Sequence, residues 1–270
     1  MNRLTLKSFD IYEDISQPVP AGQKRIRKYV ELEKQRNRRA VQTVENLVER
    51  ALLILETKDG KKALVTHAEN VVNALIKEKQ PHLYPRNDLK TFSKMPGYID
   101  KFLESLWKNF PDVKIENDGR EDAAFVRDYW APKAAGTTLE TCSSGFVASQ
   151  SGEMYLTLAS KNEENILKWK FHMIVAIVHE LGHCLTGYLS GDPNALTSKQ
   201  VGVKGKTPEA GYALELLLFK NILEMWATPN QPPNQPGVPY AFEDLLKDTK
   251  GQRISMKYIK DFIEGTSGML

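Results

Sequence analysis

The sequence HELGH at residues 179–183 constrains the fold of this chain more than any other stretch. Successive residues of a helix are about 100° apart around the axis, so histidines four residues apart lie on one face, one turn from each other. At that spacing, both imidazoles can bind a single zinc ion. Most flanking residues are apolar, no proline occurs from Trp169 to Leu189, and Gly191 stands where a helix would end. The stretch therefore predicts a buried helix that carries part of a metal site.

Glu180 follows the first of these histidines and could act as general base on a zinc-bound water. The alternative is a buried helix that carries two satisfied histidines and no metal. A glutamate between two histidines on an apolar helix is costly to bury without a metal or other partners, which favours the zinc site. The HExxH arrangement resembles that of the zinc metallopeptidases called zincins. This resemblance implies that His179 and His183 bind zinc and that Glu180 is catalytic.

A catalytic zinc site usually has three protein ligands and a water molecule, so a third ligand must lie elsewhere. No histidine follows the HELGH stretch, and a carboxylate is therefore expected. Thr207 is a good N-cap and Pro208 suits the first helical position, which predicts a helix that runs to about residue 226. Glu209 would lie in its first turn and Glu215 nearly two turns later. The residues alone leave both open, and Glu209 could also do no more than complement the helix dipole.

The sequence TPEAGYALE at residues 207–215 is similar to the ligand region of the gluzincins, the thermolysin-like zincins. Their third ligand is a glutamate on a second helix, often followed by a small residue. This implies Glu209 as the ligand, with Glu215 as the alternative, and the small residues at 210 and 211 would let the two helices approach closely. Gluzincins commonly orient a ligating histidine with an aspartate at the position that Ala213 occupies here. The two blocks also resemble a group of uncharacterised fungal zincin-like proteins.

Hydrophobic periodicity predicts an α+β chain that is mainly helical, with a small sheet packed on the active-site helix. Besides the HELGH helix, helices are expected at 24–56, 62–79, 98–110, 122–130, 208–226, 240–247 and 255–264. Strands are expected at 112–119, 145–150 and 153–160, and residues 58–61 indicate a turn. Zincins place an edge strand just before the active-site helix, where it pairs with extended peptides, and 153–160 matches that position. His67 has no ligand neighbour at useful spacing and is expected at the surface.

The chain has 270 residues, which is enough for a sizeable core. We expect a mainly helical region at 1–140, packed on a zincin-like core at 141–270 as one compact unit. The net charge of +3 gives no reason to expect a nucleic-acid or membrane partner. The longest apolar run, residues 173–178, is too short to cross a bilayer, and the first residues show no signal peptide. Two cysteines make no disulfide framework, so a cytoplasmic protein is expected, and the oligomeric state is left open.

These observations predict a zinc-dependent hydrolase, most simply a metallopeptidase with Zn2+ as cofactor. Zincins also use a tyrosine or histidine to stabilise the oxyanion, and Tyr155, Tyr188 and Tyr212 lie near in sequence. Two alternatives stay open. One is a zincin-fold enzyme that acts on a small-molecule substrate, with a narrow closed pocket in place of an open groove. The other is a non-catalytic binding protein whose zinc is structural or absent.

Overall fold

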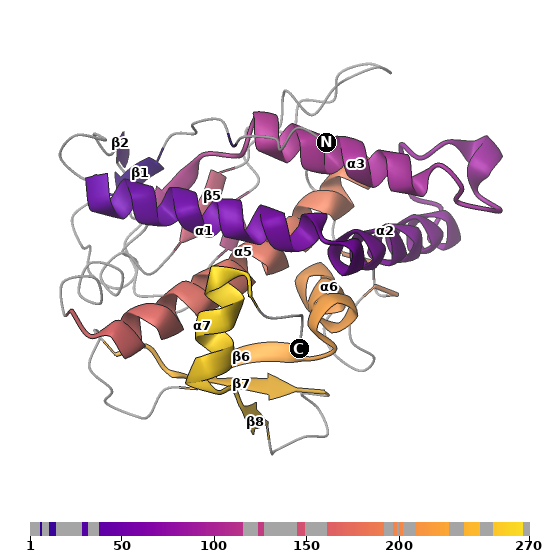
Figure 1. The fold of residues 1–270 in the computed structure, drawn as a ribbon. Helices are drawn as coiled ribbons and strands as arrows, with labels where there is room; N and C mark the ends of the chain where they lie inside the picture. The colour runs from indigo at the N-terminus through magenta and orange to yellow at the C-terminus, as the bar shows by residue number, and fades with distance from the viewer. Residues whose placement is uncertain are drawn as a thin grey trace, which may run out of the picture.

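The computed structural model describes residues 6, 11–14, 29–31, 38–115, 124–126, 145–148, 161–191, 197–198, 200–201, 209–226, 235–243 and 251–266. Within these ranges the chain is mainly helical and has two small sheets, so the predicted α+β class is confirmed. None of the described helices has the length and apolarity that a membrane crossing requires. Helix α5 (Glu163–Ser190) passes through the middle of the molecule, with other helices around it (Figure 1).

The remaining α-helices of the described chain are α1 (Arg38–Glu56), α2 (Lys58–Lys77), α3 (Met95–Lys108), α6 (Ala210–Phe219) and α7 (Met256–Glu264). A short 3-10 helix, η1, spans Arg86–Asp88. The predicted turn at 58–61 is wrong, because these residues form the first turn of α2. The side chain of Thr57 caps that turn by accepting a hydrogen bond from the Gly60 N–H.

Helix α5 carries the HELGH sequence and follows the prediction closely. It begins after the N-cap Asn162, whose side chain accepts a hydrogen bond from the Asn165 N–H. It ends at Gly191, which has the left-handed backbone conformation with φ 70°. Glycine adopts this conformation without the steric cost that a Cβ brings, which explains why the helix stops there.

A five-stranded sheet has the strand order β2-β1-β3-β5-β4. Its strands are β1 (Ile11–Asp14), β2 (Tyr29–Glu31), β3 (Val113–Ile115), β4 (Ala124–Val126) and β5 (Gly145–Ala148). β3 and β5 lie within strands predicted at 112–119 and 145–150. β2 and β4 contradict the helices predicted over 24–56 and 122–130. Each of them pairs with a strand from elsewhere in the chain, and such pairing overrides a local helical preference.

A second, antiparallel sheet follows α6 and has the order β6-β7-β8. Its strands are β6 (Ile222–Trp226), β7 (Val238–Phe242) and β8 (Gln252–Arg253). The helix predicted at 208–226 ends early, because Lys220 has a left-handed backbone with φ 60° and the chain then enters β6. The helix predicted at 240–247 is wrong where the structure describes it, since residues 240–242 belong to β7. The helix predicted at 255–264 is confirmed as α7, and the strand predicted at 153–160 lies outside the described residues.

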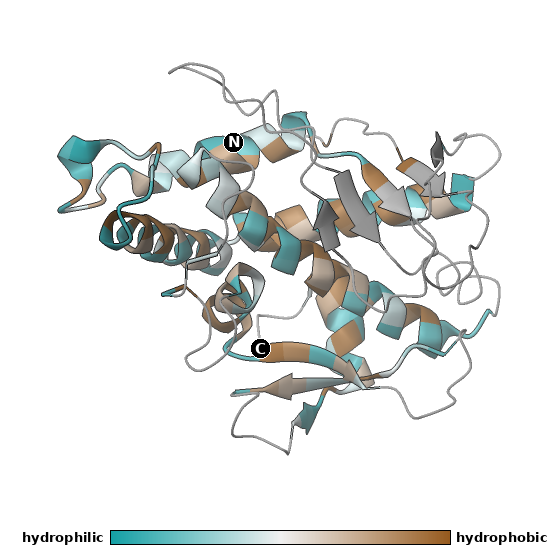
Figure 2. Cartoon of the chain, turned by 180° about the vertical axis from the view of Figure 1, so that it is seen from behind, coloured by the Kyte–Doolittle hydropathy of each residue, from teal (hydrophilic) through white to brown (hydrophobic). Residues whose placement is uncertain are grey.

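One cluster of buried apolar side chains joins all six α-helices, and it draws on both sides of residue 140. Helix α5 lies at its centre and contacts α1, α2, α6 and α7. Its most completely buried apolar side chains, each at most 2% exposed, include Trp169, Phe171, Ile174, Val178 and Leu185. Hydrophobic and hydrophilic residues alternate along this helix (Figure 2). The core therefore fixes α5 on several sides and leaves its histidine face against α6.

Candidate metal centre

The site lies where α5 and α6 cross, and glycines on both helices permit the close approach. A Cβ at Gly182 would lie 3.0 Å from the carbonyl oxygen of Ala210. A Cβ at Gly211 would lie 2.3–2.4 Å from ring atoms of His179, a distance that a real side chain could not adopt. The small residues at 210 and 211 thus place α6 against the ligand face of α5, as expected from the sequence.

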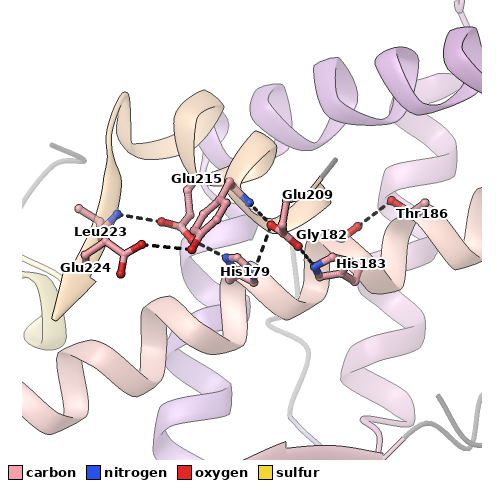
Figure 3. Close-up of polar contacts among 9 residues, drawn as sticks. His179, Gly182, His183, Thr186, Glu209, Glu215, Leu223 and Glu224 are labelled. Carbon is pink, nitrogen blue, oxygen red and sulfur yellow. Dashed lines mark hydrogen bonds and ion pairs between the residues drawn. The ribbon is translucent and has the colours of Figure 1, made fainter. Parts of the chain in front are cut away.

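His179, His183 and Glu209 converge at this crossing (Figure 3). The His179 Nε2 atom is 3.2 Å from Glu209 Oε2, and the His183 Nε2 atom contacts Glu209 Oε1. Glu209 is the N-cap of α6 rather than a residue of its first turn, and its Oε2 accepts a hydrogen bond from the Tyr212 N–H at 2.7 Å. This cap fixes the carboxylate opposite both imidazoles. The structure therefore brings together the three residues predicted as zinc ligands.

Glu180 lies near the two histidines. Its carboxylate and one ring nitrogen from each of His179 and His183 all lie within 4.8 Å of one another. The side chain of Glu180 is buried, at 6% exposure. A carboxylate in this place can reach a small molecule that is bound between the two imidazoles.

Glu215 lies behind His179 and does not join the converging Nε2 atoms. The Nδ1 atom of His179 is 2.6 Å from Glu215 Oε1, and Glu215 Oε2 accepts a hydrogen bond from the Leu223 N–H at 2.9 Å. A carboxylate on Nδ1 fixes the orientation of the ring and leaves the Nε2 lone pair for a metal. Glu215 thus has the geometry of the orienting carboxylate that is missing at Ala213, a role that the sequence analysis left without a residue.

The charges at the crossing are strongly coupled. Burial lowers the pKa of His179, but hydrogen bonds and negative charge from Glu209 and Glu215 outweigh this effect and raise that pKa to about 11. Burial raises the pKa of Glu209, yet the two histidines outweigh it and hold the pKa well below its usual range. Burial also raises the pKa of Glu215. Two carboxylates beside one imidazole form a strongly anionic environment, and such an environment favours a bound cation.

Tyr212 is one of the three tyrosines considered from the sequence, and it contacts the site directly. Its ring meets the His179 ring edge to face, with 5.0 Å between centroids. Its hydroxyl donates a hydrogen bond of 3.1 Å to Oε1 of Glu224 on β6. Burial, followed by the charge of Glu224, raises the pKa of this hydroxyl. Tyr188 packs against the ring of Phe102, and Tyr155 lies outside the described residues.

His67 on α2 is fully buried, which corrects the expectation of a surface position. Neither ring nitrogen has a hydrogen-bond partner among the described residues. Burial lowers the pKa of His67 to about 4, with smaller effects from the Gly182 backbone, His183 and Glu209. A neutral imidazole therefore lies on the core side of the site. Helical spacing signals this burial, because His67 lies four residues from both Ala63 and Val71 on the apolar face of α2, whereas its place beside the site depends on how α2 packs against α5 and α6.

Comparison of the chain with protein-family models, curated proteins and solved structures finds no match. The interpretation of this site rests on its geometry. Two imidazoles and one glutamate are the His2Glu donor set found in catalytic zinc sites. Ligand atoms about 2.0–2.1 Å from a tetrahedral zinc ion are about 3.3 Å apart. The distance of 3.2 Å between His179 Nε2 and Glu209 Oε2 agrees with that value, whereas the His183 Nε2 atom lies closer to Glu209 Oε1 than two ligands of one ion would. The donor set therefore fits a zinc ion, with a shift of the Glu209 carboxylate away from His183 to admit it.

Proposed function

We propose that this chain is a zinc-dependent hydrolase, most directly a metallopeptidase, with a zincin-like core. In this proposal His179, His183 and Glu209 hold the ion. The observation that carries it is the convergence of two Nε2 atoms on one capping carboxylate, with the Glu180 carboxylate within 4.8 Å of a ring nitrogen of each histidine. A zinc site that only stabilises the fold would not need the Glu180 carboxylate beside its ligands. The close crossing of α5 and α6 supports the same assignment, because it lets two helices supply ligands to one ion.

The residues of the site then have distinct roles. A zinc ion held there supplies Lewis-acid chemistry, since it lowers the pKa of a water molecule and polarises a substrate carbonyl. The Glu180 carboxylate accepts a proton from water as the water oxygen attacks the carbonyl carbon, and it returns that proton to the leaving amine nitrogen. Glu215 orients His179 through Nδ1. Tyr212 supports the His179 ring from the side, while its hydroxyl donates its hydrogen bond to Glu224.

The test is zinc content by elemental analysis, on wild type and on Glu209→Ala prepared in parallel. Wild type should hold about one zinc ion per chain, and the variant should lose most of it. Glu264→Ala, an exposed position at the end of α7, is the control and should keep its zinc. Glu180→Gln should also keep zinc but lose peptide hydrolysis by at least about 100-fold.

Each outcome tests the role of one residue or the function itself. Zinc retained in the Glu209→Ala protein would remove Glu209 from the ligand set. Hydrolysis retained in the Glu180→Gln protein would remove Glu180 from the mechanism. A wild-type protein that takes up no zinc, even after reconstitution, would refute the proposed function.

A further inference from the structure

Glu224 on β6 lies beside the proposed metal centre and is half-buried. Its Oε1 accepts the hydrogen bond from Tyr212, whose ring lies against His179. No ion pair involves Glu224 within the part of the chain that the structure describes. Its carboxylate remains able to accept a further, charge-assisted hydrogen bond from a cation outside the chain.

Three aromatic rings share the same face of this sheet. Glu224 lies directly opposite Tyr240 in the β6–β7 pairing, so their side chains are on one face, and Trp226 follows on that face two residues along β6. The centroid of the Trp226 ring is 6.1 Å from that of Tyr240 and 6.0 Å from that of Phe242. Trp226 is 59% exposed. Phe242 is buried and Tyr240 is half-buried, so the accessible aromatic surface on this face is that of Trp226 and part of Tyr240.

A carboxylate beside aromatic rings favours a cationic ligand. Aromatic faces attract lysine and arginine through cation–π interactions, and tryptophan is the strongest of them. A carboxylate adds a charge-assisted hydrogen bond to the same cation. Exposed tryptophans are also enriched among the residues that carry binding energy at interfaces. A purely apolar ligand would cover Glu224 without giving its carboxylate a hydrogen bond or a positive charge. The carboxylate therefore favours a cationic ligand over an apolar one.

We propose that Glu224, Trp226 and Tyr240 form a subsite for a cationic side chain, lysine or arginine, of a peptide substrate. The inference rests on the proposed function, because it takes the occupant to be a residue near the bond that is hydrolysed. Tyr212 connects the two places, since it contacts His179 through its ring and Glu224 through its hydroxyl.

The experiment measures the affinity of labelled peptides by fluorescence anisotropy, with the Glu180→Gln protein so that no peptide is cleaved. Each peptide carries a single arginine, placed in turn at two positions on either side of the central bond. A matched peptide carries citrulline at the same position, and citrulline has nearly the shape of arginine but no charge. The best arginine peptide should bind about tenfold more tightly than its citrulline partner.

Glu224→Gln, added to this protein, should abolish that preference, while the glutamine oxygen can still accept the Tyr212 hydrogen bond. Trp226→Ala should weaken the arginine peptide by a similar factor. Glu264→Gln is the control and should leave the preference unchanged. A structural role of Glu224 would lower both affinities equally, so the ratio of the two peptides separates recognition from folding.

Hydrolysis of the same peptides by wild type separates this inference from the proposed function. Hydrolysis without any difference between arginine and citrulline peptides overturns the subsite and leaves the hydrolase in place. An arginine preference that Glu224→Gln removes, without hydrolysis by wild type, supports the subsite and overturns the hydrolase. Equal affinity for both peptides at every position overturns the subsite.

Discussion

The residues of this site differ in how far sequence spacing alone could predict them. His179 and His183 lie one helical turn apart, so their convergence follows from helix geometry once the apolar context predicts a helix. The contact of Glu209 with both rings required a second helix, and the small residues after it indicated that the helices could meet. Glu215 and His67 are different, because their places beside His179 and His183 come from packing among α2, α5, α6 and β6. Sequence spacing carries no record of such contacts.

His67 yields a prediction about pH and stability. The ordinary pKa of histidine is about 6.5, and burial lowers the pKa of His67 to about 4. Between these values the unfolded chain binds a proton that the folded chain does not, so stability falls as the pH is lowered from about 6.5 to 4. The expected loss from this residue is up to about 3 kcal/mol. Above pH 6.5 both forms are neutral and the effect vanishes.

We expect His67→Leu to reduce this pH dependence and to raise stability at pH 7. The gain should be about 1–3 kcal/mol, because two buried ring nitrogens that lack a well-formed hydrogen bond to the described residues are removed. Urea unfolding at several pH values, with a chelator in every sample, measures both effects. His82→Leu, at a partly exposed loop position, is the control. A pH dependence identical to that of wild type would show that His67 does not titrate as proposed.

Helices and strands show where local pattern decides the structure and where it does not. The long apolar run of α5 was predictable, because a buried helix of this length has start and stop signals at both ends. β6 and β7 were mistaken for helices, because short apolar runs such as ILEMW fit either period. The pairing of Ile222–Trp226 with Val238–Phe242 decides for strands, and that pairing is not local. The helical core was therefore more predictable than the sheet beside the site.

The crossing of α5 and α6 gives a prediction about zinc binding and stability. Gly211→Ala would bring a methyl group to 2.3–2.4 Å from the His179 ring, so the ring must turn away from Glu209 and Glu215. Zinc content should fall strongly, and the free energy of unfolding should fall by about 1–3 kcal/mol. Elemental analysis and urea unfolding measure the two effects.

Gly97→Ala in α3 is the matched control, because no atom lies within 4 Å of the added methyl group. It should stabilise the protein by about 0.5–1 kcal/mol and leave zinc content unchanged. Full zinc content in the Gly211→Ala protein would show that the helices do not need this close approach to bind the ion.

For the whole molecule, an ion at this crossing would join two consecutive helices and, through Glu215, the sheet that follows them. His179 and His183 come from α5 and Glu209 from the start of α6, while Glu215 connects the site to β6 through the Leu223 N–H. Zinc that binds only the folded chain stabilises it by about 4 kcal/mol at 1,000 times its Kd. In a chain of this size the melting temperature should therefore rise by about 10 °C.

Calorimetry with added zinc and with chelator measures this shift. His183→Ala should lose most of it, because one of the imidazole ligands is removed. An equal shift in the His183→Ala protein would place the zinc site elsewhere in the chain.

The hydrogen bond from the Leu223 N–H to Glu215 has a consequence for solubility. β6 is an edge strand of its sheet, and unpaired N–H groups on such an edge can recruit a strand from another molecule. One of these N–H groups, that of Leu223, donates its hydrogen bond to the buried carboxylate of Glu215 on α6. The side chain that contacts His179 thus also occupies a donor that would otherwise be open to a strand of another molecule. Chains altered at Glu215 would thus lose protection against aggregation together with the orientation of a ligand.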